Sequence, residues 1–291
     1  MLADMMNTLI QGIMLGGLYG LFAAGLSLMF GVMRIVNLAH GDFIVMAAYM
    51  ALVAVTALGL HPLLTLFIVV PLMAGFGYFG QRLALNRVVG TGLLAPLMVT
   101  FGLSIIIQNL LLELFSADSR RLPLPGLDTA SIPLPGGISI GVVPLMMFAV
   151  AVAVLAGLGW FFRHTMTGRL LRAVSDDPEI VGLMGADRRH LYAIATGLAA
   201  AVVGIAGVLM AVKTNFDPLS GPTRLLFAFE AVIIGGMGSL WGTLLGGVIL
   251  GLAQAIGARI DPGIQILAGH VAFLAILAIR PQGILGRGEA P

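Results

Sequence analysis

Four ionisable side chains lie within or beside long apolar stretches of the sequence: Asp42, Glu113, Glu230 and His270. Burying a charge is costly, so such groups either pair with a neighbour or line a path for an ion, a proton or a polar substrate. Glu113 lies near the end of its run and can reach polar surroundings. For Glu230 and His270, a packing role and a pathway role are both open.

The segment MRIVNLAHGDF, residues 33–43, gathers Asn37, His40, Gly41 and Asp42 between two apolar runs. Asn37 and His40 are three residues apart, which places them on one face of a helix. One interpretation is a polar break, in which Asn or Asp caps the next helix and Gly41 permits a bend. The other is direct contact with a substrate. Caps are commoner than ligands, so the break is favoured, but Asn37, His40 and Asp42 stay candidate pathway residues.

A glycine cluster follows Glu230. Gly235, Gly236 and Gly238 fall within GGMGSLWG, residues 235–242, which divides a long apolar run. Glycines this dense are poor helix formers. They either open the backbone at membrane depth for a pathway or a gate, or they form a tight turn. Both interpretations are open, and Glu230 with the three glycines completes the set of candidate pathway residues.

The stretch LLRAVSDDPEIVGLMGADRRHL, residues 170–191, is a charged segment between apolar runs. Either Asp176 caps a short helix and Glu179 completes a capping-box pattern, or Asp177 caps it with Pro178 in the first helical position. A helix this short is unstable alone in water, and its acidic first turn would be repelled by anionic headgroups. The segment therefore predicts a short helix on which a protein partner packs.

No residue pattern for ATP binding or for enzymatic catalysis occurs in the chain. The P-loop pattern GxxxxGK[ST] is absent, and the only lysine, Lys213, lies between two apolar runs. HExxH and GxSxG are absent too, and the lack of cysteine excludes cysteine-ligated metals. The formal net charge of +2 is too small to indicate nucleic-acid binding. We therefore expect no catalytic residue, no metal site and no cofactor.

Membrane-spanning helices must position these residues, because the composition exceeds what a soluble core can bury. The chain of 291 residues is 59% hydrophobic and 10% charged, with a mean hydropathy of +1.06. Ordinary globular domains carry about 25% charged residues, and a run of about 20 apolar residues spans a bilayer. Such runs lie near 9–32, 43–58, 63–83, 95–115, 141–162, 192–212 and 264–279.

A further apolar run, 225–258, is long for one span and short for two full ones. It predicts a broken or re-entrant helix pair, because irregular backbone is tolerated at membrane depth where protein covers it. The predicted fold is therefore all-α: a polytopic transmembrane helical bundle of about eight spans. Residues 1–291 form a single transmembrane domain.

Basic residues orient this bundle. Arginines are concentrated in the loop 163–191, so the positive-inside rule places it in the cytoplasm. The loop 84–94 lies two spans earlier and shares that side, while parity places 116–140 and the N-terminus outside. Basic residues after the last run favour a cytoplasmic C-terminus. That requires 225–258 to cross the membrane an even number of times or to re-enter.

The inner-membrane permeases of branched-chain amino acid ABC transporters resemble this chain in three stretches. These are GLSLMFGVMRIVNLAHGDFIVMAAY (25–49), GRLLRAVSDDPEIVGLMGAD (168–187) and FEAVIIGGMGSLWGTLLGGVILG (229–251). The likeness covers nearly the whole chain in order, ends with RPQGILG (280–286), and is to the shorter, LivH-type permease of the pair. Related permeases for urea, short amides or other amino acids share these motifs, so the resemblance is less specific for the substrate.

The resemblance implies a bacterial inner-membrane subunit that moves branched-chain or similar hydrophobic amino acids. The implied partners are a second, homologous permease, two ATP-binding subunits and a periplasmic substrate-binding protein. It also implies that the cytoplasmic loop 163–191 carries a coupling helix seated on an ATPase subunit. The corresponding positions are Arg172, Asp176, Asp177, Pro178, Glu179, Leu183 and Gly185.

Two classes of function follow. A permease of an ABC importer takes its energy from another chain, which agrees with the missing ATP-binding pattern and the short charged helix. A self-contained secondary transporter or channel would need ion-coupling residues, and Glu230 with Asp42 is a thin set for that. Neighbouring genes for ATPases and a binding protein would favour the importer.

Overall fold

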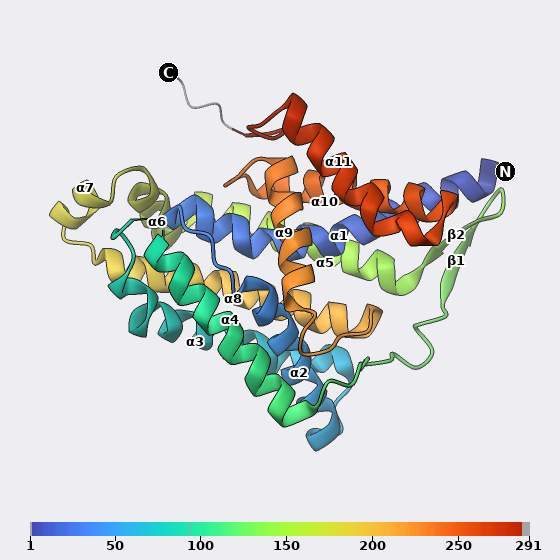
Figure 1. The fold of residues 1–291 in the computed structure, drawn as a ribbon, viewed down its shortest axis with the longest axis horizontal. Coiled ribbons are helices and arrows are strands. Elements are labelled where there is room, and N and C mark those ends of the chain that lie inside the picture. Colours follow the sequence, from blue (N-terminus) through green and yellow to red (C-terminus); the bar gives the residue numbers. More distant parts are fainter. Residues whose placement is uncertain (1, 93, 287–291) are drawn as a thin grey trace.

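The computed structural model describes residues 2–92 and 94–286, which are mostly helical (Figure 1). Eight helices in this part of the chain are long and apolar enough to cross a membrane, which confirms the predicted polytopic bundle. The α-helices are α1 (Leu2–Met33), α2 (His40–Leu58), α3 (Leu66–Leu83), α4 (Leu94–Phe115), α5 (Val142–His164), α6 (Met166–Asp176), α7 (Pro178–Leu183), α8 (Arg188–Lys213), α9 (Gly221–Gly235), α10 (Leu240–Ile260) and α11 (Gln265–Ile279). The minor elements are the 3-10 helices η1 (Pro62–Thr65), η2 (Leu85–Arg87) and η3 (Pro262–Ile264) and an antiparallel hairpin of β1 (Ser131–Leu134) and β2 (Ile138–Gly141).

α1 and α8 are the most buried of these long helices. α1 packs closely on α10 through glycines: a Cβ at Gly247 would lie 2.6 Å from the amide nitrogen of Gly20, and one at Gly12 would lie 2.9 Å from the Cα of Leu252. Small residues at such positions let helix backbones approach closely within a membrane. α8 packs against α1, α2 and α3. The other helices are therefore arranged around α1 and α8.

The predicted broken pair near 225–258 is present as α9 and α10. α9 has 15 residues and α10 has 21, so α9 is shorter than a full span. Figure 1 shows α9 running steeply across α1 and α10 instead of alongside them. The pair is thus one short crossing helix and one full span, joined by a turn at 236–239.

α2 begins inside the bundle, because its first residues, among them His40 and Asp42, are buried. Residues 34–39 before it are not helical. Arg34 follows α1 in a left-handed conformation with φ of 53°, and its amide donates to the carbonyl of Phe30 over 2.8 Å. The chain then returns along α1, since the His40 ring at the start of α2 hydrogen-bonds to the carbonyl of Phe22. Non-helical backbone inside a membrane protein requires such cover by other residues.

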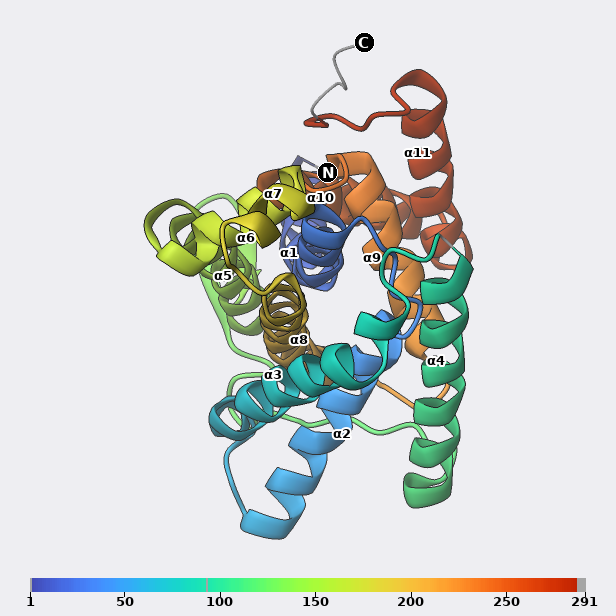
Figure 2. The same ribbon diagram turned by 90° about the vertical axis from the view of Figure 1, so that its left-hand side faces the viewer.

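The loops gather at two ends of the bundle that differ in charge. One end holds the N-terminal residues and the hairpin, where the Ser139 amide donates to Asn7 over 3.0 Å. The other holds α6, α7 and the residues after α11, and Figure 2 looks onto it. The loop before α4 shares that end with the loop before α8, since Asn86 donates to the carbonyl of Arg189 over 3.1 Å. Most of the described arginines are at the α7 end: Arg34, Arg82, Arg87, Arg163, Arg169, Arg172, Arg188, Arg189 and Arg280.

Two elements were not expected from the sequence. The segment 116–140, placed outside by parity, leads into the hairpin, whose strands have four residues each, too few for a clear alternation of side chains. α6 begins with Thr165 as its cap, which accepts from the amide of Gly168 over 3.0 Å. Its buried residues, among them Leu171 and Val174, pack against the bundle, so most of the polar stretch before α7 is helical too.

Candidate functional site

Asp177 caps α7, the short helix predicted within the charged loop. Its carboxylate accepts hydrogen bonds from the amides of Glu179 and Ile180 at 2.9 and 3.0 Å. Asp176 is the last residue of α6, so the second of the two predicted caps is the observed one. Pro178 occupies the first helical position, where its missing amide hydrogen leaves no bond unmade.

α7 exposes apolar side chains. Val181 is 3% exposed and anchors the helix, whereas Ile180, Leu183 and Met184 are 55%, 88% and 80% exposed. Gly185 then turns the chain with φ of 85°, a conformation that residues with a Cβ disfavour. Exposed apolar groups clustered on an anchored helix are typical of a protein-binding surface.

α6 ties this exposed helix to the membrane-spanning helices. The Ser175 hydroxyl donates to the carbonyl of Gly31 near the end of α1. Gly168 packs on α5, because a Cβ there would lie 2.7 Å from the Cα of Phe162. The Asp187 side chain caps α8 just beyond α7. α7 is therefore connected to α1, α5 and α8 through α6 and Asp187.

The predicted coupling residues divide between two elements. Those in α7 or at its ends are Asp177, Pro178, Glu179, Leu183 and Gly185. Arg172 and Asp176 belong to α6 and line a groove between α6, the end of α1 and the residues after α11. The structure thus brings most of the set together on α7 and places two members beside it.

Asn37 and His40 hold the non-helical segment between α1 and α2. Asn37 Oδ1 accepts from the amide of Ala39 over 3.0 Å, and His40 Nε2 lies 2.7 Å from the carbonyl oxygen of Phe22. Both side chains are fully buried. Hydrogen bonds from a side chain to nearby backbone stabilise such irregular segments. The predicted polar break is present, but the predicted Asn or Asp cap is not, because the N-cap of α2 is Ala39 and has no side-chain hydrogen bond.

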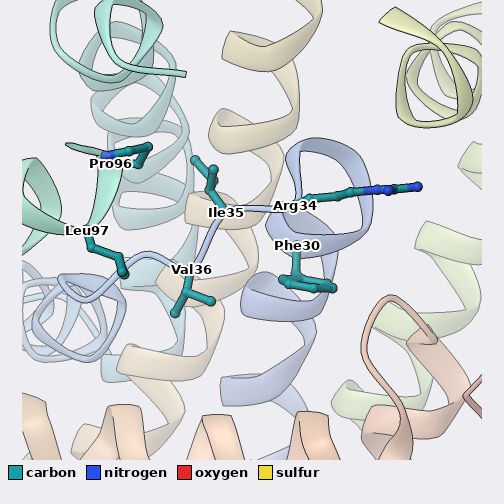
Figure 3. Close-up of a pocket in the computed structure, with 6 residues that line it drawn as sticks. All are labelled: Phe30, Arg34, Ile35, Val36, Pro96 and Leu97. Carbon is teal, nitrogen blue, oxygen red and sulfur yellow. The ribbon is translucent and has the colours of Figure 1, made fainter. Parts of the chain in front are cut away.

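A small cavity of about 100 Å³ lies beside this segment. Its lining residues are Phe30, Arg34, Ile35, Val36, Pro96 and Leu97. Figure 3 shows the Arg34 side chain extending away from Pro96 and Leu97. The rest of the lining is apolar, so the cavity offers no set of polar groups that would orient a ligand.

Asp42 joins α2 to α4. Its carboxylate, 1% exposed, accepts from Ser104 Oγ at 2.6 Å and from Gln108 Nε2 at 3.0 Å. The Thr100 hydroxyl oxygen, also on α4, accepts a hydrogen bond from the amide of Leu38 over 3.2 Å. These partners were missed from the sequence, although Thr100, Ser104 and Gln108 are spaced four residues apart and so share one helical face.

The start of α9 meets α2 beside Asp42. A Cβ at Gly41 would lie 2.7 Å from the amide nitrogen of Leu225, and one at Gly221 would overlap the Asp42 carboxylate. Gly41 therefore lies within α2 and permits close approach, rather than forming the predicted bend. The N-terminal turns of two helices converge on one carboxylate, whose negative charge suits both helix dipoles.

Glu230 and His270, considered separately in the sequence, form one pair between α9 and α11. Glu230 Oε1 hydrogen-bonds to His270 Nδ1, and the side chains are 2% and 30% exposed. Beside them, Tyr19 donates to Gln254 over 2.7 Å, and the ring centres of Tyr19 and Phe227 are 5.1 Å apart. Four helices thus meet at a polar cluster, and Gln254 was missed although it stands within the apolar stretch 244–258.

This cluster is not fully paired within the described residues. Glu230 Oε2 and Gln254 Nε2 are buried there without a hydrogen-bond partner. Buried polar atoms are usually paired, and ionisable residues inside a membrane are candidates for function. Glu230 therefore has the strongest structural support among the predicted pathway residues.

The predicted pathway glycines form the turn between α9 and α10. Gly235 ends α9, and Gly236 and Gly238 have φ of 101° and 82°. The residues after α11 close this turn: the amides of Ile284 and Leu285 donate to the last two carbonyls of α9 over 2.8 and 3.0 Å. The observed geometry is that of the tight turn.

The candidate residues therefore form separate groups. Asp42 lies with its α4 partners, Glu230 lies with His270, and the coupling residues lie at the α7 end. Across residues 2–92 and 94–286, no three His, Cys, Asp or Glu side chains are placed to hold a metal ion. The arrangement can bind a partner at one end and transmit its movement through the helices.

Comparison with known proteins identifies this architecture. Residues 8–279 match the family described as "branched-chain amino acid transport system / permease component". The chain belongs to this permease family. The matched range includes α7, the Asp42 contacts and the Glu230–His270 pair. The family consists of transport permeases and not of enzymes. Together with the eight helices of the described part of the chain that are long and apolar enough to cross a membrane, this membership supports a multi-pass membrane protein.

Relatives match the permease over nearly its whole length. The high-affinity branched-chain amino acid transport system permease protein BraD of Pseudomonas aeruginosa is 31% identical over 301 residues, which cover 98% of this chain and 96% of BraD. LivH of Salmonella typhimurium is 26% identical over 298 residues, with 98% and 96% covered. A probable LivH of Methanocaldococcus jannaschii is 23% identical, with 91% and 88% covered. These matches confirm the LivH-type resemblance.

Proposed function

We propose that this permease is the membrane-spanning subunit of an ABC importer for branched-chain or similar hydrophobic amino acids in the bacterial inner membrane. The observation that carries the proposal is α7, a capped and anchored helix with exposed apolar side chains at the arginine-rich end. The chain has no P-loop pattern, so its energy source is a separate ATPase subunit bound to α7.

Coupling in this proposal is mechanical. Closure of two ATPase subunits moves α7, and α6 transmits the movement because Ser175 is bonded to Gly31 at the end of α1. α8 starts just beyond α7 and is buried along most of its length. Tilting α1 and α8 therefore moves the bundle as a unit, and rigid rocking of this kind is sufficient for alternating access.

The path for the substrate runs, in this proposal, beside α2 and α9, which both begin inside the bundle. They meet at Asp42, and α9 carries Glu230 to its contact with His270. An apolar substrate side chain needs few polar partners, so this small set of groups suffices.

The α7 end faces the cytoplasm in this proposal, because Lys and Arg accumulate on the cytoplasmic side of membrane proteins. The hairpin end then faces the periplasm and receives substrate from a binding protein. A second, homologous permease completes the assembly. The family description as one component of a transport system supports such further subunits.

A self-contained secondary transporter is the second candidate. The Glu230–His270 pair favours it, because carboxylate and imidazole groups inside a membrane can relay protons. Membership of the permease family favours the importer. Within the importer class, urea and short amides are the alternative substrates.

Uptake into proteoliposomes tests the proposal. Together with its ATPase subunits, second permease and binding protein, the chain should take up leucine only when ATP is supplied. The chain alone should take up none, with or without a pH gradient. Leucine uptake by the chain alone would contradict the importer, and ATP-driven uptake of urea without leucine would reassign the substrate.

A further inference from the structure

A large open groove lies at the α7 end, beside α7 and away from the Glu230–His270 pair. Its volume is about 1170 Å³. Its walls come from the end of α1, the junction of α5 and α6, the turn between α9 and α10, and residues 281–286. Figure 2 looks onto this end of the bundle. The groove is therefore built where membrane-crossing helices end.

Positive charge dominates its polar lining. The lining arginines are Arg34, Arg163, Arg169 and Arg172. All four are exposed, and no ion pair involves them within residues 2–92 and 94–286. Asp176 is the single carboxylate among the described lining residues. A cleft with such an excess of positive charge attracts an anion.

Arg34 adds a separate observation. It has φ of 53°, a left-handed conformation that favours glycine and is uncommon for other residues. Figure 3 shows its side chain extending away from Ile35 and Val36. Strained backbone positions cluster at functional sites, and the Arg34 side chain lines the groove.

Much of the remaining lining is apolar and partly uncovered. It includes Phe30, Phe162, Met237, Leu240, Trp241 and Leu285. Met237 and Trp241 are 49% and 45% exposed. A soluble phosphate would use only the arginines, whereas a ligand with both a phosphate and hydrocarbon chains matches both kinds of wall.

We propose that this groove binds an anionic phospholipid, with its phosphate against the arginines and its acyl chains against the apolar wall. Basic pockets between membrane helices on the cytoplasmic side bind such headgroups. Tryptophan is also enriched at the level of the headgroups, and Trp241 lies in this wall. The proposal depends on the orientation given above but not on which substrate is carried.

Tryptophan fluorescence tests the site directly, because the chain has only Trp160 and Trp241. In a Trp160→Phe background Trp241 reports on the groove, and in a Trp241→Phe background Trp160, 61% exposed on α5, reports on general lipid contact. Delipidated protein in micelles is titrated with phosphatidylglycerol or phosphatidylcholine that carries brominated, quenching acyl chains. We expect the quenching of Trp241 to reach half its maximum at a concentration of phosphatidylglycerol at least twentyfold below that of phosphatidylcholine. Trp160 should be quenched equally by both lipids.

Removing charge from the groove should remove this preference. Arg163→Gln with Arg169→Gln should lower it about 25-fold, since each basic residue near an anionic surface contributes about fivefold. The matched control, Arg87→Gln with Arg188→Gln, neutralises two exposed arginines at the same end that are outside the groove lining, and should leave it unchanged. Arg163→Lys with Arg169→Lys should retain most of it.

Three outcomes would overturn the proposal. Equal quenching of Trp241 by the two lipids would do so without any arginine variant. Reversal of the quenching by inorganic phosphate, added at a concentration equal to that of the lipid phosphate, would identify a site for soluble phosphate. A preference that survives Arg163→Gln with Arg169→Gln, or is lost equally in the control, would assign it to the general charge of this end.

Discussion

At the scale of single residues, the hydrogen bond between Glu230 and His270 fastens α11 to the bundle. α11 and η3 together are only slightly buried, so α11 has little packing of its own. Hydrogen bonds between membrane helices contribute about 0.6 to 2 kcal/mol. The pair therefore has a structural value that does not depend on its proposed place beside the substrate path.

Replacing Glu230 with leucine should leave His270 without this partner. We expect the Glu230→Leu variant to lose about 1–2 kcal/mol of unfolding free energy and to transport less, as measured by thermal unfolding and by uptake. Glu113→Gln alters an exposed carboxylate on α4 and should change neither. Glu230→Leu with His270→Leu should cost less than the two single changes added together. Unchanged uptake by Glu230→Leu would assign the residue to packing.

Asp42 and Glu230 could be selected from the sequence because ionisable residues stand out in apolar runs. Their partners could not be assigned, because pairing depends on which helices become neighbours. His270 was noted on its own, and only the position of α11 beside α9 joins it to Glu230. The even spacing of Thr100, Ser104 and Gln108 was a visible signal for a polar helix face.

At the scale of elements, α7 depends on its boundaries. Gly185→Trp would force a bulky side chain into a backbone with φ of 85°, and Glu179→Arg would place a positive charge at the positive end of the helix. We expect both variants to insert into the membrane but to fail to retain ATPase subunits in a pull-down. Arg188→Gln, just beyond α7, serves as the control. Normal retention by either α7 variant would refute α7 as the binding helix.

α4 is held by few contacts. It packs mainly on α2, and the Ser104 and Gln108 bonds to Asp42 are its polar link. Ser104→Ala with Gln108→Leu should speed hydrogen exchange in 94–115 and lower stability by about 1–3 kcal/mol, because a buried acceptor loses its donors. Asn109→Leu is the control, since Asn109 bonds to a carbonyl of its own helix. Equal exchange in all three proteins would show that apolar packing holds α4.

The long helices were predicted close to their observed positions because an apolar run reports a span directly. The short elements were harder. α6 has buried residues on one side and polar residues on the other. The hairpin strands expose most of their side chains. Such elements are stabilised by contacts with distant parts of the chain, which local composition does not record.

At the scale of the whole molecule, the number of crossings decides which loops share a side. Arg259 at the end of α10 donates to Thr8 over 3.3 Å, so this end lies beside the N-terminal residues. A reporter enzyme fused after Arg259 should therefore show periplasmic activity, while one fused after Met184 should show cytoplasmic activity. Cytoplasmic activity of the first fusion would contradict the topology.

Counting arginines was enough to group the loops at two ends, because the distribution of charge follows the membrane and not the details of packing. The groove at the α7 end was beyond such counting. It combines residues from α1, α5, α6, α10 and the chain after α11, and only the folded molecule shows that four separate arginines line one surface.

The two hydrogen bonds from residues 284 and 285 to the end of α9 have a consequence for biosynthesis. The last two carbonyls of α9 find their partners in a segment that is translated only after α10 and α11. Until then, α9 has been inserted with an unfinished end, which is unfavourable for backbone groups in apolar surroundings. Residues 284 and 285, which are translated after α11, therefore complete the end of α9, and truncation before them should yield a permease that inserts but is readily degraded.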